Sequence, residues 1–449
     1  MRTVFKKVIV TLLTLEAGVI VRRHKPRIIA VTGSVGKTST KDAIYEVVAQ
    51  GAYVRKSQKS FNSEIGLPLT ILGRPNAWNN PLQWLLNLVD GLFIMVGTAR
   101  YPEWLVLEVG ADRPGDIKRV ARWLPVDIAV ITRLPEVPVH VEFFESAAQV
   151  AEEKAALIDA LRPNGTLVLY ADDARASQLK ERAAGKKIIT FGFAPEADVR
   201  VEDMKILFEG GRERWPVGMS ARIVAEGVSA PVQVLGTLGA HTLLPALAAA
   251  AVGQALGKTV SDSAEALKAY EPPQGRMHLV RGIKETFIID DTYNSSPAAV
   301  NAALDTLKMI GGAASSWLAP LGGGITQGRL IAVLGDMLEL GRLSVEEHRK
   351  IGIYLAELKI DMLVTVGFRA RDIAEGAQMG GMAEVSILQF EDAQKAGEEL
   401  AALVQSGDCI LVKGSQSVRM ERTVKELMAN PERAGDILVR QDEEWIKKR

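Results

Sequence analysis

The sequence predicts an α/β protein with mainly parallel sheets and more than one domain. Short β-branched runs alternate with helical stretches from Arg27 onward, a pattern typical of strands joined by helices. The alternation stops at Glu271-Pro272-Pro273-Gln274-Gly275 and then restarts. A chain of 449 residues also exceeds what one core supports, because single cores stop growing near roughly 250 to 300 residues. We therefore expect an N-terminal apolar and basic helical segment at 1–26, a first domain at 27–270 and a second at 271–449.

Helix, loop and strand signals can be placed along the chain. The helical run 146–161 ends at Arg162-Pro163-Asn164-Gly165, a strong stop signal, and an alanine-rich helix is expected at 243–256. The stretch 311–328 is rich in Gly, Ala and Ser, which predicts a mobile loop. Apolar runs predict strands at 28–31, 105–108, 128–132, 166–170, 286–290, 330–334, 362–366 and 408–412.

Charge and cysteine content exclude several classes of function. Lys plus Arg and Asp plus Glu both number 54, so no overall field attracts nucleic acid, and we expect no nucleic-acid partner. Cys409 is the only cysteine, which excludes an internal disulfide and a cysteine-based zinc site and suits a reducing cytoplasm. Because Cys409 lies in an apolar run, we expect it to pack and not to react.

The clearest chemical motif is a glycine-rich loop between an apolar strand and a helical run, Thr32-Gly33-Ser34-Val35-Gly36-Lys37-Thr38. In such a loop the backbone N–H groups and the helix N-terminus face a phosphate, Lys37 adds a positive charge, and the Thr38 hydroxyl can bind Mg²⁺. A structural glycine turn is the alternative. The flanking strand and helix favour a nucleoside triphosphate site made of Gly33, Ser34, Val35, Gly36, Lys37, Thr38 and Ser39.

This loop resembles that of the Mur ligase family, which has Thr-Gly-x-x-Gly-Lys-Thr between a strand and a helix. The resemblance implies a central P-loop-type domain with a mainly parallel sheet and a C-terminal Rossmann-like α/β domain. It also implies ATP-dependent amide-bond formation through an acyl phosphate. Further matching segments follow in order: Asn62-Ser63-Glu64-Ile65-Gly66, Leu107-Glu108-Val109-Gly110-Ala111, Glu152-Glu153-Lys154, Gly275-Arg276, Asp290-Asp291-Thr292-Tyr293-Asn294, Gly335-Asp336-Met337-Leu338-Glu339 and Lys413-Gly414-Ser415.

The resemblance assigns the catalytic and metal-binding residues, with ATP and Mg²⁺ as cofactors. Glu108 ends an apolar strand at the edge where α/β sheets place ligands, so its carboxylate can bind Mg²⁺, and a structural ion pair is the alternative. By resemblance, His140 binds a second Mg²⁺, and Lys154 reacts with CO₂ to give a metal-binding carbamate. From its neighbours Glu152 and Glu153 alone, Lys154 would belong to a solvated helix face. The expected metal ligands are Thr38, Glu108, His140 and Lys154.

Both domains are expected to contact the nucleotide. By resemblance, Asn62 approaches the γ-phosphate, and Arg276 reaches the phosphates once the domains close. Asp291 is expected on the ribose or adenine side, with Tyr293 and Asn294 shaping the turn. An Asx-type turn before a helix is the alternative, and the same residues can build both. The amino-substrate side is expected to contain Asp336, Glu339, His348, Lys413 and Ser415.

Two segments depart from the family pattern. Family members that act on nucleotide-linked muramoyl peptides have an N-terminal uridine-nucleotide-binding domain, whereas about 26 residues precede the first expected strand here. The segment 239–245 lacks the asparagines that usually follow the family's histidine, which leaves adenine recognition and nucleotide preference open.

Two apolar stretches, 8–21 and 84–96, bear on membrane contact. Each is shorter than the roughly 20 apolar residues that span a bilayer. With Trp78 and Trp104 near the second stretch, they predict either packing, a protein partner, or peripheral contact with a membrane through 1–26 and 78–104. We therefore expect a cytoplasmic protein that can lie at the inner face of the membrane, as a monomer or weak dimer.

The expected function is an amide ligase of cell-wall peptide assembly that acts on small-molecule or peptide substrates. The motifs are most similar to the branch that adds D-alanyl-D-alanine to a muramoyl-peptide carboxylate. Two alternatives stay open: a related ligase for a folate-type or lipid-linked carboxylate, and a nucleotide-binding scaffold without ligation.

Overall fold

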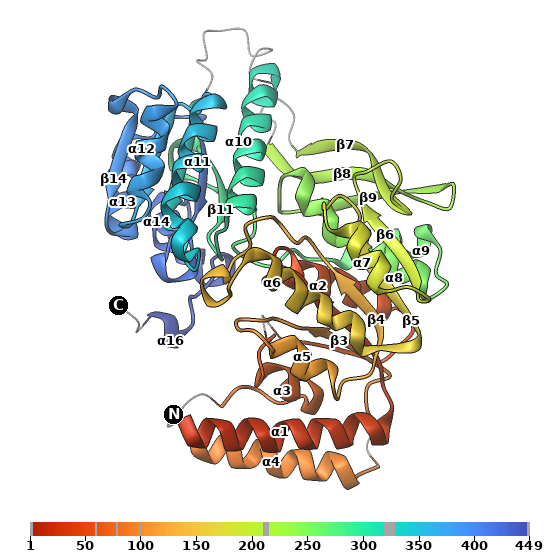
Figure 1. Cartoon of the computed structure of the whole chain (residues 1–449). Helices are drawn as coiled ribbons and strands as arrows, with labels where there is room; N and C mark the ends of the chain where they lie inside the picture. The colour runs from red at the N-terminus through yellow and green to blue at the C-terminus, as the bar shows by residue number, and fades with distance from the viewer. Residues whose placement is uncertain are drawn as a thin grey trace.

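The computed structural model describes residues 3–58, 61–77, 80–98, 100–209, 215–317 and 328–446. Their strands form a nine-stranded and a six-stranded sheet, and helices pack on both (Figure 1). The predicted α/β class is confirmed. Residue 271 lies in the connection between the sheets, after the last helix of the first part.

The first sheet has the order β2-β3-β1-β4-β5-β6-β7-β8-β9. Neighbours from β2 to β7 are parallel, and β7, β8 and β9 are antiparallel. The parallel order places the carboxyl ends of β1, β3 and β4 side by side, at the edge where α/β sheets bind ligands. The strands are β1 Arg27–Thr32, β2 Val54–Lys56, β3 Trp104–Glu108, β4 Val126–Ile131, β5 Leu161–Tyr170, β6 Lys187–Gly192, β7 Val199–Glu209, β8 Trp215–Ala225 and β9 Val228–Leu235.

Helices cover both faces of this sheet because strand residues alternate between two cores. In β1, Ile29 and Val31 pack in the core that contains α2 and α8, whereas Ile28 and Ala30 pack in the core that contains α1, α3 and α5. The helices of this part are α1 Thr3–His24, α2 Lys37–Ala49, α3 Gly66–Leu72, α4 Pro81–Val96, α5 Asp116–Ala121, α6 Ala147–Ala155, α7 Ala176–Arg182, α8 Leu244–Ala255 and α9 Val260–Ala266.

The second sheet has the order β10-β11-β15-β12-β13-β14, and its pairs are parallel except for β10–β11. Its strands are β10 His278–Arg281, β11 Phe287–Asp291, β12 Leu330–Gly335, β13 Met362–Val366, β14 Ile387–Phe390 and β15 Cys409–Lys413. Its helices are α10 Pro297–Trp317, α11 Ser344–Glu357, α12 Arg371–Met379, α13 Ala393–Leu403, α14 Glu421–Leu427, α15 Ala434–Ile437 and α16 Glu443–Ile446.

All eight predicted strands are present, but two other predictions were wrong in part. The helical run 146–161 ends early: α6 stops at Ala155, a 3-10 turn follows, and β5 starts at Leu161, so the stop signal lies inside a strand whose pairing with β4 is irregular. The stretch 311–328 is not a loop throughout, because α10 continues to Trp317, and residues 318–327 lie outside the described residues.

At one end of the molecule α1 and α4 lie side by side (Figure 1). Arg23 Nη2 donates to the Val96 carbonyl at 3.0 Å, and His24 Nε2 lies 3.0 Å from the Ile94 carbonyl. These contacts join the C-terminal ends of the two helices. Trp84 and Trp104 are buried, and Trp78 lies outside the described residues. Within the described part of the chain, no helix is long and apolar enough to cross a membrane.

Candidate functional site

A cavity of about 990 Å³ lies where the carboxyl ends of the two sheets meet. Its wall includes Ser34 to Thr40 after β1, Glu108 at the end of β3, and Asp291 to Ser296 after β11. Both sheets therefore supply polar side chains to one space, as expected for a site that assembles two substrates and a nucleotide.

The loop after β1 takes its shape from two glycines. Gly33 has φ 144°, and a Cβ there would lie 1.9 Å from Thr132 Oγ1, so no larger residue fits. Gly36 has φ 85° and precedes the first turn of α2. The Thr132 hydroxyl donates to the carbonyl of Val35 at 2.7 Å, and the Ser34 N–H donates to the carbonyl of Arg133 at 3.0 Å. The end of β4 thus fixes the loop and the N-terminus of α2 against the cavity.

Lys37 begins α2 and folds back over the loop. Its Nζ donates to the carbonyl of Gly33 at 2.9 Å. Burial lowers the pKa of Lys37, while the carboxylate of Glu108 opposes that shift. A cation in this position, beside exposed N–H groups of a helix N-terminus, can bind the phosphates of a nucleotide.

Glu108 is 1% exposed at the end of β3, and its two carboxylate oxygens differ. Oε1 accepts from Asn62 Nδ2 at 2.9 Å, whereas Oε2 is buried without a hydrogen-bond partner among the described residues. An unsatisfied buried carboxylate oxygen is costly unless a cation is close. The free oxygen fits a hard cation such as Mg²⁺, and Lys37 is a nearby positive charge.

Three consecutive residues of α6 have three different environments. Glu152 faces outward and pairs with Arg182 at 2.5 Å. Glu153 is buried and accepts from the N–H groups of Gly115, Ile117 and Lys118 at 2.8, 2.7 and 3.1 Å, which caps α5. Lys154 is 1% exposed, so the solvated-face alternative was wrong. Burial, followed by the charge of Lys37, lowers the pKa of Lys154 to about 7.

His140 connects the two sheets. It has φ 67°, in a turn after β4, and its Nδ1 lies 2.6 Å from Glu339 Oε2 in the loop after β12. The bond to His140 lowers the pKa of Glu339. The Glu142 N–H also donates to the Glu339 carbonyl at 3.2 Å. The predicted metal ligand and a predicted substrate residue are thus paired here, and Asp112 Oδ1 lies 3.9 Å from the other ring nitrogen.

Arg276 reaches across the cavity to the phosphate loop. Its Nη2 donates to Thr38 Oγ1 at 3.2 Å, and its guanidinium lies 4.1 Å from the ring centroid of Tyr293. Its Nε is buried without a hydrogen-bond partner among the described residues. The stacked guanidinium is therefore oriented toward the loop and keeps a donor available for a phosphate oxygen.

The turn after β11 is held by Lys413. Lys413 Nζ pairs with Asp291 Oδ2 at 2.5 Å and donates to the carbonyl of Asn294 at 2.9 Å, and Asp291 Oδ1 accepts from the Met277 N–H at 3.2 Å. Asn294 Oδ1 accepts from the Ser295 N–H, only one residue on, whereas the spacing of an Asx-type turn is made by Asp290 Oδ1, which accepts from the Thr292 N–H at 3.1 Å. Two of the three Lys413 donors are thus committed to the protein, so a substrate carboxylate would have to compete with Asp291.

The remaining residues predicted for the amino-substrate side do not line the cavity. Asp336 Oδ1 accepts from the Ala370 N–H at 2.8 Å, and Ser415 Oγ accepts from the Leu338 N–H at 2.9 Å. His348 is fully buried, with Nε2 accepting from the Met337 N–H and Nδ1 bonded to the Ser344 carbonyl. The prediction for His348 was wrong, because one ring nitrogen supports the loop after β12 and the other is bonded to the first residue of α11.

Sequence reasoning missed several cavity residues. Arg133 and Asp112 follow the ends of β4 and β3, so their position after a strand was an available signal. His241 lies in the departing segment 239–245 and also lines the cavity; burial lowers its pKa to about 4, so it is neutral near pH 7. Trp445 in α16 joins the wall from the C-terminal tail, which has no recognisable motif.

Among the described residues, no group of three or more His, Cys, Asp and Glu side chains is placed to hold a metal ion. The four predicted metal ligands are not such a group, because two of them, Thr38 and Lys154, are neither His, Cys, Asp nor Glu. Their oxygen donors, Thr38 and the free Glu108 oxygen, both belong to residues that line the cavity.

Comparison with protein families gives two matches that together cover most of the chain. Residues 31–81 and 86–253 match the Mur ligase middle domain, and residues 275–416 match the Mur ligase, glutamate ligase domain. Both the phosphate loop and the segment with Arg276, Asp291 and Lys413 lie inside these matches.

Individual relatives agree. The UDP-N-acetylmuramoyl-tripeptide–D-alanyl-D-alanine ligase of Mycobacterium leprae is 32% identical over 403 residues, covering 87% of this chain and 71% of the relative. That of Bacillus subtilis is 29% identical over 405 residues, covering 90% and 76%. Among solved structures, MurF from Thermotoga maritima in complex with ADP has a TM-score of 0.71 at 27% identity, covering 93% of this chain and 83% of that one. MurF from Acinetobacter baumannii has the same fold, with a TM-score of 0.73 at 23% identity and coverage of 92% and 79%.

Proposed function

The chain belongs to the Mur ligase family and is an ATP-dependent, ADP-forming ligase, and from that premise we propose that it joins D-alanyl-D-alanine to the terminal carboxylate of a muramoyl tripeptide in cell-wall synthesis. The observation that supports this most is the meeting of Lys37, Arg276 and the free Glu108 oxygen around one cavity. The relatives from Bacillus subtilis and Mycobacterium leprae, which match most of this chain, are named for this reaction.

The proposed chemistry has two steps. A carboxylate oxygen of the tripeptide attacks the γ-phosphorus of ATP, and the bond to the β-phosphate oxygen breaks, so that ADP leaves and an acyl phosphate forms. The amine of the dipeptide then attacks the acyl carbon, phosphate leaves with the bonding electrons, and the amine loses a proton. The loop Gly33 to Ser39, Lys37 and Arg276 would stabilise the charge on the transferred phosphoryl group.

For the metal, we propose Thr38 and Glu108 as ligands of one Mg²⁺, and His140 with a carbamate on Lys154 as ligands of a second. When bound, Mg²⁺ supplies positive charge that offsets the developing negative charge of phosphoryl transfer. The lowered pKa of Lys154 supports the carbamate, because only the neutral amine attacks CO₂, with loss of one proton. His140 would have to exchange its pairing with Glu339 for the metal.

For the substrates, we propose that Asn62 orients Glu108 and approaches the γ-phosphate, and that Asp291, Tyr293 and Asn294 contact the nucleoside. Lys413 and Ser415 would hold the dipeptide carboxylate after a rearrangement that frees Lys413 from Asp291. Asp336 and Glu339 would bound the same side. The segments 1–26, 27–270 and 271–449 would act as an attachment segment, an ATP-binding domain and an amino-substrate domain.

The test is a ligation assay with the full chain, ATP and Mg²⁺. The carboxylate partners are a uridine-nucleotide-linked and a lipid-linked muramoyl tripeptide, and the amines are D-alanyl-D-alanine and single amino acids. ADP release matched by a condensed product of the expected mass, and absent in Lys37→Ala, supports the proposal. ATP binding without turnover on any pair would contradict it and favour a nucleotide-binding scaffold. Turnover with only a different pair would retain the ligase but replace its substrates.

A further inference from the structure

The outward sides of α1 and α4 expose large apolar side chains, which together are here called the docking face. Four of its residues are more than 60% exposed, namely Leu15, Leu82, Phe93 and Val96 at 61, 65, 67 and 70%. The helices α1 and α4 lie side by side at one end of the molecule (Figure 1) and pack against each other, so both contribute residues to the docking face. The docking face consists of Val8, Leu12, Leu15, Val19, Leu82, Leu85, Leu86, Val89, Leu92, Phe93 and Val96.

The docking face belongs to a fixed part of the fold. The opposite sides of the two helices are buried in the core of the first sheet, through Leu13, Ile20 and Trp84 among others. Gly91 lets α1 approach closely, since a Cβ there would lie 2.1 Å from Glu16 Oε2. Both helices therefore have two apolar sides in the folded protein, one packed inside and one exposed.

Most of the exposed charges on α1 and at its C-terminal end are positive, although Lys6 is paired with Glu64 at 2.9 Å. Lys6 and Lys7 are exposed at one end of α1, and Arg22, Arg23 and Lys25 at the other. The two helices contain only two acids, and neither offsets these cations at the surface: Glu16 is buried, and Asp90 pairs with Arg74 at 3.1 Å.

We propose that the docking face binds the surface of an anionic lipid bilayer, with α1 and α4 lying in the plane of the interface. The outward residues of α4 are all apolar from Leu82 to Val96, so the face offers a protein partner no polar group in that helix to recognise. A bilayer interface requires only buried apolar side chains and cations near the headgroups of an anionic leaflet. The described helices are not long and apolar enough to span, which agrees with in-plane binding.

The docking face is one helix away from the cavity. Both α1 and α4 pack on α3, and three residues that precede α3, namely Asn62, Ser63 and Ile65, line the cavity. Lys6 of α1 pairs with Glu64 in that segment at 2.9 Å. Bilayer binding would therefore hold the cavity close to a lipid surface, and the inference does not depend on which carboxylate the cavity accepts.

The test is flotation of the full chain with vesicles of phosphatidylcholine containing one quarter phosphatidylglycerol, compared with phosphatidylcholine alone. Binding is expected to the anionic vesicles and to weaken by tenfold or more with neutral lipid or high salt. Leu85→Ser combined with Phe93→Ser is expected to reduce binding at least tenfold. The matched control is Phe368→Ser with Val385→Ser, whose side chains are 76 and 87% exposed on the other sheet, and it is expected to bind like the unmodified chain.

Charge and folding are checked separately. Lys7→Gln with Arg22→Gln is expected to weaken anionic binding about tenfold without changing the melting temperature, because both side chains are exposed. No binding to anionic vesicles, or equal loss in the control variant, would overturn the proposal. A dimer in sedimentation that dissociates only with the Leu85 and Phe93 substitutions, without vesicle binding, would overturn it in favour of a second copy of the chain.

Discussion

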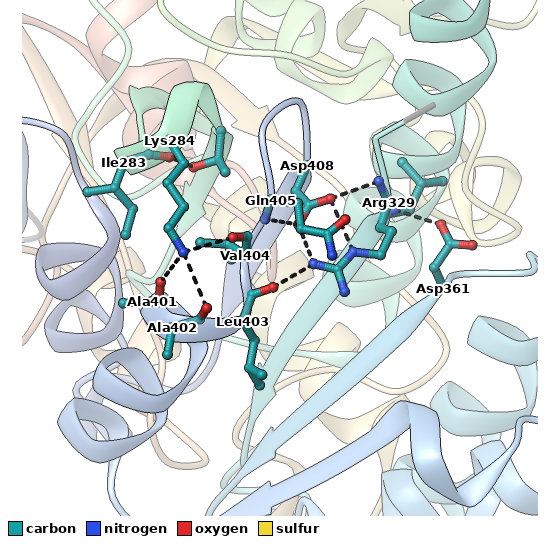
Figure 2. Close-up of polar contacts among 12 residues, drawn as sticks. Ile283, Lys284, Arg329, Asp361, Ala401, Ala402, Leu403, Val404, Gln405 and Asp408 are labelled. Carbon is teal, nitrogen blue, oxygen red and sulfur yellow. Dashed lines mark hydrogen bonds and ion pairs between the residues drawn. The ribbon is translucent and has the colours of Figure 1, made fainter. Parts of the chain in front are cut away.

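Polar groups at the amino end of the second sheet and polar groups around the cavity are used in opposite ways. At the amino ends of β12 and β15, Arg329 and Asp408 form a closed network (Figure 2). Arg329 Nη2 pairs with Asp408 Oδ2 at 2.6 Å and donates to the Leu403 carbonyl at 2.9 Å, and the Gln405 N–H donates to Asp408 at 2.8 Å. The groups drawn there have partners within the protein.

Lys284 completes this end. Its Nζ donates to the carbonyls of Ala401, Ala402 and Val404 at 3.0, 3.2 and 3.0 Å, at the C-terminus of α13 (Figure 2). A cation at a helix C-terminus satisfies carbonyls that the helix leaves unpaired. Lys284 is therefore a structural residue, although the local sequence does not distinguish it from Lys154.

Around the cavity, where the carboxyl ends of both sheets meet, polar atoms are buried without partners among the described residues. They include Ser34 Oγ, Glu108 Oε2, Arg276 Nε and Ser295 Oγ, and all four residues line the cavity. Satisfied polar groups hold a fold together, whereas unsatisfied ones at a cavity indicate the ligand that would satisfy them. Whether a buried polar group has a partner in the protein therefore separates structural from functional groups better than its residue type does.

The largest expected effect is the loss of Lys154. Lys154→Met keeps the length of the side chain but cannot form a carbamate, and we expect kcat to fall by on the order of 10²–10³-fold. The melting temperature should not fall, because an apolar side chain replaces a buried amine whose desolvation is unfavourable. Steady-state kinetics and thermal unfolding measure the two effects.

Glu152→Ala, on the same helix but exposed, is the control and should change kcat less than twofold. A ¹³CO₂-labelled carbamate signal is expected for the unmodified protein and not for Lys154→Met. Full activity of Lys154→Met would contradict the proposed carbamate, because the buried amine near Lys37 would then be dispensable.

The next largest effect is on stability, at the amino end of the second sheet. Asp408→Ala leaves Arg329 and the Gln405 N–H without their acceptor and should lower the free energy of unfolding by about 3 kcal/mol, measured by denaturant titration. Activity per folded molecule should stay the same. Glu375→Ala, which breaks an exposed pair with Arg349, is the control and should cost less than about 1 kcal/mol. A specific loss of kcat in Asp408→Ala would contradict the division between this end of the sheet and the cavity.

Local motifs explain what the sequence predicts well. The phosphate loop is a contiguous strand-loop-helix unit, so Gly33, Gly36 and Lys37 can be placed without tertiary information. Glu108 was predictable because a polar residue that ends an apolar strand lies at the sheet edge. The exposed side chains of α1 and α4 also follow from their apolar runs.

Other features depend on contacts between distant segments. The pairing of His140 with Glu339 joins residues 199 positions apart in the chain, and no local pattern encodes it. Lys154 and Glu153 are neighbours with different roles, because Glu153 caps the N–H groups of α5 and Lys154 does not. The antiparallel strands β7 to β9 were not predicted, since β7 is largely exposed and lacks a continuous apolar run.

The smallest expected effect tests an exception to the comparison. Glu16 Oε2 is buried without a partner among the described residues, yet it lies between α1 and α4 and not in the cavity. Burial raises the pKa of Glu16 to about 7. The unfolded chain ionises near the ordinary value of 4.5, so the protein loses stability as pH rises from about 4.5 to 7 and stays at the lower level above that.

Glu16→Gln removes this titration and resembles the protonated form. At pH 8 it should raise the melting temperature by roughly 2–4 °C, which corresponds to about 1 kcal/mol for a partly solvated carboxyl, and the gain should vanish at pH 4.5. Glu64→Gln, an exposed residue near the same helix, should show no such pH dependence. Unchanged kcat would show that an unsatisfied group indicates a ligand only when it faces a cavity; a fall in kcat comparable to that of Lys154→Met would mean instead that the α1–α4 pair is coupled to the reaction.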